Sequence, residues 1–453
     1  MRKLLPIFIF SLFALSSNAQ WESQASGFSD PFQGINQIVI TDATSAWATS
    51  FDGSGNGNTL QQYTRTTDGG LTWVPSTVTT APANYEWSCF AAVDDQNAWA
   101  MFYDAGLGAK VGIFGTTDGG QTWTSQESGQ IFSASASFPD VLYFWDASTG
   151  VAAGDPINGE YEIYTTTDGG VNWILVDGAN IPNPTNGEFG LTRSFAARGN
   201  SFWFGTNKGR LYKTTDFGAT WTVYSTGTTD AIVSLDFADE MVGWVELSNN
   251  TSFAFKSIQR TIDGGTTWTN ITPAGTFFNP SQNGGLAYVP YTAYTLVASG
   301  FDNTNLVYGS AYSLDAGDTW VTIDSDVFHF AVSFFDNLTG WSGGVNTDYV
   351  TDGMWKYSGA FVATNVKGIE LSEFNLYPNP SSGVFYFSFN AQNDQPIHIR
   401  VTDAIGRTVF EKVYKDKSET WLRQIDLRNF SKGIYFLDLE NNGNYSSEKL
   451  LIN

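Results

Sequence analysis

Short apolar stretches alternate with polar turn residues along most of the chain. One unit recurs: a strand-like stretch, a polar turn, and a second strand that begins near an aromatic residue. This unit occupies residues 38–47, 90–99, 194–203, 235–244 and 332–341, with looser variants at 141–151 and 285–300. Stretches of this length bounded by turn residues are typical of antiparallel strands. The pattern therefore predicts an all-β protein with seven pairs of neighbouring strands.

A second motif recurs between these strand pairs at a nearly constant spacing. It reads Ser/Thr-x-Asp-x-Gly-x-Thr-Trp, with small departures, and occurs six times. Its aspartates are separated by 50, 50, 48, 47 and 52 residues and are Asp68, Asp118, Asp168, Asp216, Asp263 and Asp315. A repeat of about 50 residues that is built from short strands is typical of propeller blades.

The residue types of this motif suit a tight hairpin. Asp accepts hydrogen bonds from the backbone of its own turn, Gly adopts the positive φ that the turn requires, and Trp packs between neighbouring sheets. The motif resembles the Asp-box (BNR) repeat of sialidases, sortilin-type receptors and photosystem-assembly propellers. The resemblance implies that the six aspartates are structural and remote from the ligand site, so none is a candidate catalytic group.

Seven strand pairs and only six Asp boxes leave one blade incomplete. Residues 354–358 predict a third strand for the last blade, after which the pattern stops. Residues 21–27, at the other end, match residues 123–129, which begin at the Trp of the second Asp box. We therefore expect the N-terminal segment to supply the outer strand of the last blade, which removes an exposed sheet edge. The sequence predicts a seven-bladed β-propeller over residues 20–360.

The first 19 residues have the pattern of a signal peptide. Two basic residues, Arg2 and Lys3, precede an apolar run over residues 4–15, and a series of small residues ends at Ala19. The apolar run is too short to cross a bilayer, and no later run is long enough to predict a transmembrane segment. The pattern predicts export of a mature chain that begins at Gln20.

Residues 374–453 follow a predicted linker at 361–373 and alternate apolar and polar positions between turns, which predicts a small β-sandwich. Four ordered motifs, at 376–380, 403–407, 427–435 and 449–452, resemble the type A sorting domain of type IX secretion cargo in Bacteroidetes. The residues that carry this resemblance are Tyr377, Pro378, Asn379, Pro380, Gly406, Gly433 and Tyr435.

The sorting-domain resemblance implies a partner and a destination. The partner is the type IX secretion machinery, which recognises such a domain and removes it after passage across the outer membrane. The remaining propeller is then expected to be secreted or attached to the outer-membrane surface. A carbohydrate-binding or spacer sandwich is the alternative, and the Pro-Asn-Pro and Lys-Gly-Ile-Tyr motifs argue against it.

Composition and charge limit the classes of partner that the repeat region can bind. Aromatic residues make up 16% of the chain and Gly occurs 46 times, which favours strands and tight turns over helices. Residues 1–373 carry 13 basic and 36 acidic side chains, whereas residues 374–453 carry nine of each. The acidic field of the repeat region disfavours nucleic acid and anionic membranes. Cys89 is the only cysteine, so no intrachain disulfide forms, and its apolar surroundings predict a buried side chain.

The arginines of the repeat region do not suit a sialidase, whose family uses three arginines around the substrate carboxylate. Arg65, Arg210 and Arg260 each precede an Asp box, which predicts a position near the turn between the third and fourth strands. Arg198 is expected in the turn between the first and second strands, at the same end of the blades. Only Arg193 is expected on the opposite, ligand-binding face, so we predict that no arginine triad forms.

Other catalytic patterns are weak. His329 and His398 are expected to be packing or surface residues that lack the neighbours of a triad or a metal site. No phosphate-binding loop, metal motif or cofactor motif occurs, so neither a metal nor a cofactor is predicted. A glycosidase needs two carboxylates roughly 5–10 Å apart across the sugar, and the many acidic residues leave this alternative open.

Ligands of propellers most often bind over the central channel, on loops between the second and third strands and between blades. In the loops at 82–87, 154–161 and 183–190, aromatic side chains could stack on sugars or peptide side chains and carboxylates could orient them. The candidate ligand-binding residues are Tyr85, Trp87, Asp155, Tyr161, Glu188 and Arg193. The alternative is that these side chains only order their loops.

Two functions stay open at this point. The first is a non-enzymatic, monomeric propeller that binds an extracellular glycan or protein. The second is a glycoside hydrolase with a carboxylate pair on the channel side of the propeller.

Overall fold

The computed structural model describes residues 20–104, 111–126, 131–134, 136–252, 254–279, 284–302, 307–347, 351–361, 372–390, 397–403, 407–414, 421–441 and 444–453. The predicted signal peptide and most of the predicted linker lie outside these ranges. Within them the one helical element is a single 3-10 turn, η1 (Gly178–Asn180), and all other regular structure is β.

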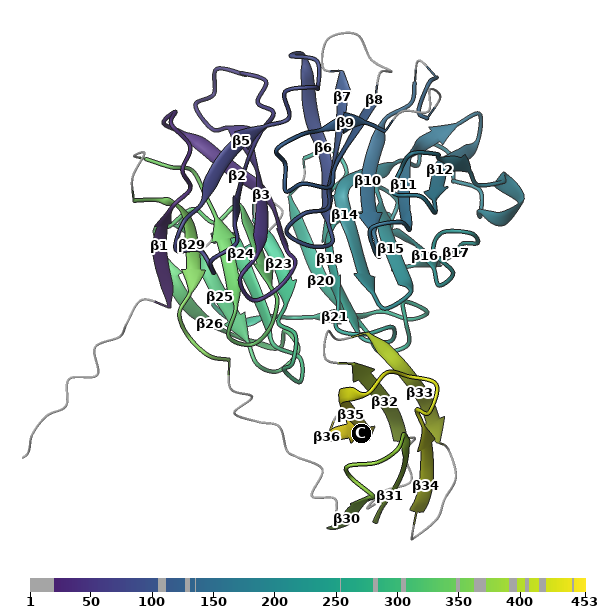
Figure 1. Ribbon diagram of the computed structural model, residues 1–453. Helices are drawn as coiled ribbons and strands as arrows, with labels where there is room; N and C mark the ends of the chain where they lie inside the picture. The colour runs from purple at the N-terminus through teal and green to yellow at the C-terminus, as the bar shows by residue number, and fades with distance from the viewer. Residues whose placement is uncertain are drawn as a thin grey trace, which may run out of the picture.

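Seven antiparallel sheets succeed one another between residues 20 and 361 and form the blades of a propeller (Figure 1). Blade 1 consists of β2 (Gln33–Ile40), β3 (Ala46–Asp52), β4 (Gln62–Thr66) and β5 (Val74–Thr77). Blade 2 consists of β6 (Tyr85–Ala92), β7 (Ala98–Asp104), β8 (Val111–Thr116) and β9 (Thr124–Ser125). Blade 3 consists of β10 (Pro139–Phe144), β11 (Gly150–Ile157), β12 (Glu160–Thr166) and β13 (Ile174–Leu175). Blade 4 consists of β14 (Gly190–Arg198), β15 (Ser201–Thr206), β16 (Arg210–Thr214) and β17 (Thr222–Ser225).

The remaining blades depart slightly from this four-strand plan. Blade 5 consists of β18 (Ala231–Phe237), β19 (Gly243–Ser248), β20 (Phe255–Thr261) and β21 (Thr269–Ile271). Blade 6 consists of β23 (Gly285–Tyr288), β24 (Leu296–Asp302), β25 (Val307–Ser313) and β26 (Thr319–Ser325), and gains a fifth strand because β22 (Ala274–Gly275) pairs in parallel with β26. Blade 7 consists of β27 (Ala331–Phe334), β28 (Gly340–Gly343), β29 (Gly353–Tyr357) and β1 (Trp21–Ala25).

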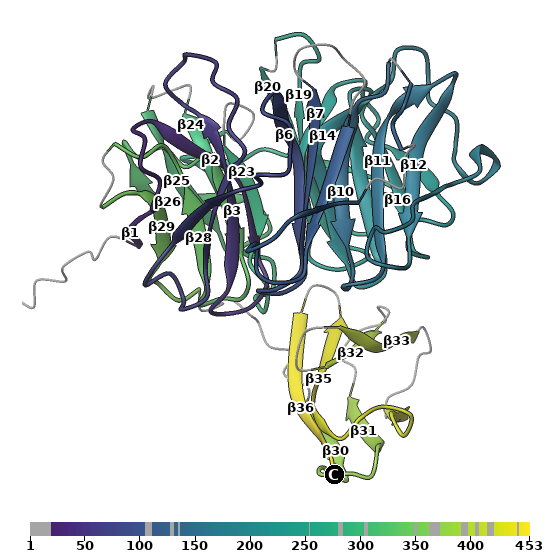
Figure 2. The same cartoon turned by 45° about the horizontal axis from the view of Figure 1, so that its top comes forward.

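The blades close into a ring. The first strands β2, β6, β10, β14, β18, β23 and β27 contact one another in this order, and β27 contacts β2 again. The blades stand side by side in both views (Figures 1 and 2). Second-strand tryptophans fill the space between blades, since Trp47, Trp99, Trp203, Trp244 and Trp341 are each at most 2% exposed. The prediction of a seven-bladed propeller is confirmed.

The N-terminal strand completes blade 7, as the sequence predicted. β1 pairs antiparallel with β29, and Trp21 lies opposite Tyr357. The side chains of β1 also reach the blades on either side. Trp21 Nε1 donates to Ser310 Oγ of blade 6 over 2.9 Å. Gln24 Oε1 accepts from the indole of Trp73 in blade 1 over 3.0 Å.

The Asp boxes form hydrogen-bonded turns of one geometry. In the first box, Thr66 Oγ1 donates to Asp68 Oδ1 over 2.8 Å and accepts from Gly70 N over 2.9 Å. Asp68 also accepts from the backbone N and the hydroxyl of Thr72, at 2.9 and 2.6 Å. Equivalent bonds recur in the other five boxes. Such bonds stabilise the charged carboxylate and, led by the one from Thr122, lower the pKa of Asp118 to about 2.

Residues 372–453 form two facing sheets around their own apolar core, which confirms the predicted sandwich. One sheet has the order β30 (Ser372–Tyr377), β31 (Val384–Asn390), β34 (Trp421–Asp426). The other has the order β33 (Thr408–Tyr414), β32 (Ile397–Asp403), β35 (Gly433–Asn441), β36 (Asn444–Ile452). The Pro-Asn-Pro motif holds the last strand, because Asn379 Nδ2 donates to Lys449 O over 2.6 Å and Asn379 Oδ1 accepts from Leu451 N over 2.9 Å. Gly406 lies outside the described residues.

We predict that the propeller depends on Trp21 for stability. Trp21→Ala removes a 5% exposed ring from the contact between blades 6 and 7 and is expected to lower the free energy of unfolding by about 3–5 kcal/mol. Denaturant unfolding followed by tryptophan fluorescence measures this change. Val74→Ala serves as the control, since Val74 is 60% exposed and its replacement should change stability by less than about 0.5 kcal/mol. Equal stability of the two variants would contradict a closing role for β1.

Candidate functional site

The two ends of each blade differ in their chemistry. One end carries the Asp boxes and the turns between first and second strands. The other carries the turns between second and third strands and the segments that enter each first strand, and we call it the channel face. All six candidate ligand-binding residues lie toward the channel face, close to the ends of β6, β11, β12 or β14 or in the segment before β14.

Three of these candidates are core residues. Tyr85, Trp87 and Tyr161 are 8%, 8% and 2% exposed. The Trp87 ring lies 4.3 Å from Phe102, and the Tyr161 ring lies 4.7 Å from Tyr212. Rings enclosed in this way offer no face on which a sugar or a peptide side chain could stack. Their observed role is packing within and between blades.

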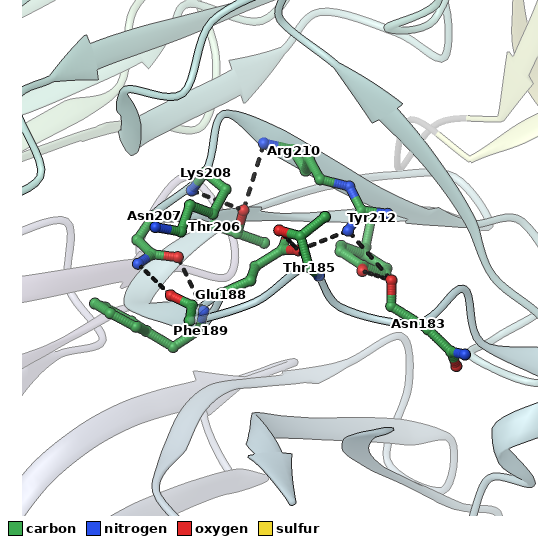
Figure 3. A network of polar contacts seen from close by, with 10 residues as sticks. Asn183, Thr185, Glu188, Phe189, Thr206, Asn207, Lys208, Arg210 and Tyr212 are labelled. Carbon is green, nitrogen blue, oxygen red and sulfur yellow. Dashed lines mark hydrogen bonds and ion pairs between the residues drawn. The ribbon is translucent and has the colours of Figure 1, made fainter. Parts of the chain in front are cut away.

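Glu188 anchors the segment that enters blade 4 (Figure 3). Its buried carboxylate pairs with Arg210, with 2.6 Å between Oε2 and Nη1. The same oxygen accepts from the backbone N and the hydroxyl of Thr185 at 2.7 and 2.9 Å. Arg210 also donates to Asn183 O over 3.2 Å and lies over the ring of Tyr212. The carboxylate of Glu188 therefore interacts with Arg210 and Thr185 of the protein itself, and these bonds order the segment before β14.

The expected position of Arg210 is wrong. The sequence placed it near the turn between the third and fourth strands because it shortly precedes an Asp box. β16 is only five residues long, however, and Arg210 is its first residue, at the channel face. Arg210 is already paired with Glu188, so it is not available to bind a substrate carboxylate as part of a sialidase-type arginine triad.

Asp155 lies against a second carboxyl group that the sequence reasoning missed. Asp140 is 3% exposed and sits at a register shift of β10, between Pro139 and Val141. Its side chain is within hydrogen-bonding contact of Asp155, which also accepts from Gly190 N over 3.1 Å. An acidic residue at the start of an otherwise apolar inner strand was the available signal.

Both carboxyl groups of this pair favour the protonated form. Burial raises the pKa of Asp155 to about 6, and burial together with the charge of Asp155 raises the pKa of Asp140 well above its ordinary value. Two neighbouring buried carboxyl groups cannot both ionise at low cost, so Asp140, the more deeply buried of the two, keeps its proton. Because the groups touch, no sugar ring can lie between them.

Arg193 is the candidate residue that stays unpaired. It lies on β14 where the pairing with β15 is interrupted, between Gly190 and Phe195, and its φ is +62°. No described residue accepts a hydrogen bond from its guanidinium or forms an ion pair with it. Burial lowers its pKa, and the nearby Cys89 and Tyr103 of blade 2 partly oppose this effect. Among the described residues, this guanidinium of blade 4 therefore has no acceptor, and the groups that influence it belong to blade 2.

His329 has neighbours that the sequence did not predict. Its Nε2 lies 2.7 Å from Asp324 Oδ2, and its Nδ1 lies 2.7 Å from Ser342 Oγ. The expectation that His329 lacks triad neighbours is therefore wrong. The side chains of His329 and Ser342 are nevertheless fully buried, and the Trp21 ring lies 5.4 Å from the imidazole. The array joins blades 6 and 7 at the place where β1 closes the ring, and a substrate has no access to the serine.

The other arginines serve the end with the Asp boxes, as expected. Arg65 Nη1 donates to Gly119 O, in the next Asp box, over 2.6 Å. Arg260 approaches Ala316 O in the same manner at 3.3 Å. Arg198 pairs with Asp236 over 2.8 Å. These three side chains connect neighbouring blades.

The described residues contain no group of three or more His, Cys, Asp or Glu side chains that could hold a metal ion. A small cavity of about 170 Å³ opens beside Trp99, Thr122 and Asp168, between the Asp boxes of blades 2 and 3. No helix in the described part of the chain is long and apolar enough to span a membrane.

The fold defines an all-β propeller protein, and its hydrogen-bonded turns are consistent with a propeller of the BNR type. The C-terminal residues 375–453 match the family described as "Secretion system C-terminal sorting domain". The chain therefore carries a type IX sorting domain, which indicates secretion or attachment to the outer-membrane surface. The sequence matches no curated protein.

Solved structures resemble the propeller in fold. YCF48 bound to D1 peptide is 16% identical, with a TM-score of 0.50, over 76% of this chain and 97% of that chain. YCF48 from Cyanidioschyzon merolae is 15% identical, with a TM-score of 0.48, over 75% and 98%. The Hadza microbial sialidase Hz136 is 15% identical, with a TM-score of 0.43, over 74% and 68%.

The Asp140–Asp155 pair predicts an unusual pH dependence. Both carboxyl groups bind a proton more tightly in the folded protein than in the unfolded chain, so their contribution to stability is full below pH 4 and falls as pH rises through about 6. Asp140→Asn keeps a donor for Asp155 and is expected to flatten this dependence and to be more stable than the wild type at pH 7–8. Denaturant unfolding between pH 4 and pH 8 measures both effects. A variant with an unchanged slope would contradict the raised pKa values of this pair.

Proposed function

We propose that this protein is a non-enzymatic binding propeller that is exported by the type IX system and holds an extracellular ligand at the channel face. The domain limits that we propose are 1–19 for the signal peptide, 20–360 for the propeller, 361–373 for the linker and 374–453 for the sorting domain. The sorting-domain match supports this route of export. After removal of both end segments, a monomeric propeller remains outside the cell.

The unpaired guanidinium of Arg193 carries the proposal for binding. A half-buried charged donor that has no acceptor among the described residues is unfavourable, and a bulky residue at positive φ adds backbone strain. Both costs persist at one residue, which lies toward the channel face. A ligand carboxylate would satisfy the guanidinium with two parallel hydrogen bonds. YCF48, which shares the fold, has been solved with a bound peptide, and peptides as well as acidic glycans carry such carboxylates.

A glycoside hydrolase is the less supported alternative. Asp140 and Asp155, the carboxyl pair at the channel face, lie close together, and burial raises the pKa of both. Glu188 is committed to Arg210 and Thr185. These carboxyl groups stabilise the junction of blades 3 and 4, and they do not flank a sugar-sized gap.

The experiment for the binding function compares Arg193→Gln with the wild type on a glycan array and a peptide array. We expect the wild type to retain carboxylate-bearing ligands and the variant to bind them roughly tenfold or more weakly, because the charged partner of the carboxylate is lost. Glutamine at the same strained φ controls for stability, and Arg198→Gln, at the opposite end of the blades, should bind normally. Hydrolysis of any array glycan that is lost in Asp155→Asn would instead establish the enzyme.

The export route has its own test. Deletion of residues 374–453 is expected to leave the propeller folded but retained inside the cell envelope of a type IX host, since the recognised domain is gone. Cell fractionation with an antibody against the propeller measures its location. Full secretion of the truncated protein would contradict the assignment.

A further inference from the structure

A strip of aromatic rings crosses the channel face from blade 6 through blade 7 to blade 1. Tyr308 stands at the start of β25, Phe328 and Phe330 lie in the segment that enters β27, and Phe51 lies near the end of β3. Successive ring centroids are 3.8 Å apart for Tyr308 and Phe328, 5.8 Å for Phe328 and Phe330, and 5.3 Å for Phe330 and Phe51. We call these four residues the aromatic strip.

Gly34 allows the strip to reach the innermost strand of blade 1. Gly34 lies opposite Phe51 in the ladder between β2 and β3. A Cβ atom on Gly34 would come within 2.1 Å of the Phe51 ring. The missing side chain therefore gives the ring its place against the inner strand.

The strip and the neighbouring Phe32 expose apolar surface, and the backbone of Phe32 is strained. Phe328 is 43% exposed, and Phe32, which directly precedes β2, is 51% exposed. Phe32 has a φ of +63°, which is unfavourable for a bulky residue. Two backbone hydrogen bonds hold it there, from Phe32 N to Asn346 O at 3.0 Å and from Gly53 N to Phe32 O at 2.8 Å. Folding gains little from an exposed ring, so strain at this position is a sign of binding.

The parts of blades 6, 7 and 1 that carry the strip contain no Lys or Arg. Lys356 of blade 7 and Arg65 of blade 1 lie at the other end of the blades, where they donate to Gly69 O and Gly119 O. Residues 4–64 and 261–355 contain 13 acidic residues and no Lys or Arg. Asp52 directly follows Phe51, and Asp326 comes two residues before Phe328. Hydrogen bonds from Ser54 and from the backbone of Asn58 lower the pKa of Asp52, so this carboxylate is charged at neutral pH. The surface is aromatic and negative, with no built-in counter-charge.

We propose that the aromatic strip binds an extended polypeptide segment that carries Lys or Arg beside apolar side chains. The inference rests on the proposed function of the channel face and specifies its ligand. Aromatic faces attract ammonium and guanidinium groups, and neighbouring carboxylates strengthen this attraction. Three of the four rings are Phe, which offers no hydrogen bond to sugar hydroxyl groups. In this proposal, a carboxylate of the same segment pairs with Arg193 of blade 4.

The test uses the mature chain, residues 20–453, and three matched sets of short synthetic peptides. The sets share their apolar residues and differ in carrying Lys and Arg, Asp and Glu, or Ser and Gly at the remaining positions. We expect the basic set to bind best, and its affinity to fall at high salt because the attraction is electrostatic. A soluble β-glucan oligosaccharide, measured by titration calorimetry, serves as the glycan probe and should not bind.

Two variants, one in the strip and one at the neighbouring Phe32, locate the binding, and we call them the strip variants. Phe328→Ser removes an exposed ring, and Phe32→Gly replaces a strained residue with one that tolerates positive φ, so the latter should be at least as stable as the wild type. Each is expected to weaken binding of the basic peptides roughly tenfold. Val321→Ser, which alters a 52% exposed residue on the outer strand β26, is the matched control and should bind normally.

Three results would overturn the inference. One is equal or better binding of the acidic or neutral peptides, and another is glucan binding that is lost in Phe328→Ser. The third is basic-peptide binding that both strip variants keep. If Arg193→Gln abolishes that binding while the strip variants keep it, the binding function of the channel face stands and the role of the strip alone is refuted.

Discussion

The antiparallel pairing of β1 with β29 is the constraint on which the propeller depends, because a ring of sheets is stable only when its last blade is complete. The pairing joins the two ends of the propeller. The side chains of β1 also contact the blades on either side of blade 7. Trp21 contacts blade 6, and Gln24 accepts from tryptophans of blades 7 and 1. The buried His329 and Ser342 and the partly exposed Asp324 form one polar array, and the His329 ring packs against Trp21 of this strand. A group that looks catalytic is therefore part of the closure.

The two ends of the blades use their polar groups differently. At one end the Asp boxes satisfy their carboxylates within their own turns, and Arg65, Arg198 and Arg260 connect neighbouring blades. At the channel face, Arg193 has no partner among the described residues, and Phe32 is held exposed at positive φ. Hydrogen bonds and ion pairs stabilise the end with the Asp boxes. The channel face keeps a charged group without a partner and an exposed, strained residue, and a bound ligand would contact both. This difference is the physical basis for placing the binding function at the channel face.

The candidate site was only partly accessible to sequence reasoning. The loops were placed at the correct end of the blades, because strand order fixes where each loop emerges. Burial was not predictable for Tyr85, Trp87 and Tyr161. An aromatic residue looks the same in the sequence whether its ring faces solvent or a neighbouring blade. Arg210 was misplaced because the length of its strand is decided by pairing with β15 and β17. Asp140 went unnoticed because its partner, Asp155, is 15 residues away in the chain.

The sequence by itself determined the architecture: the number of blades, the closing strand, the structural role of the Asp boxes and the presence of a sorting domain. These features are local or periodic, so they can be recognised in each repeat. The residues of the Asp box also suit only one type of turn. Only the tertiary structure decided which polar side chains meet. The pairs Glu188–Arg210, Asp140–Asp155 and His329–Asp324 and the contacts of the aromatic strip depend on distances between segments, which no local pattern encodes.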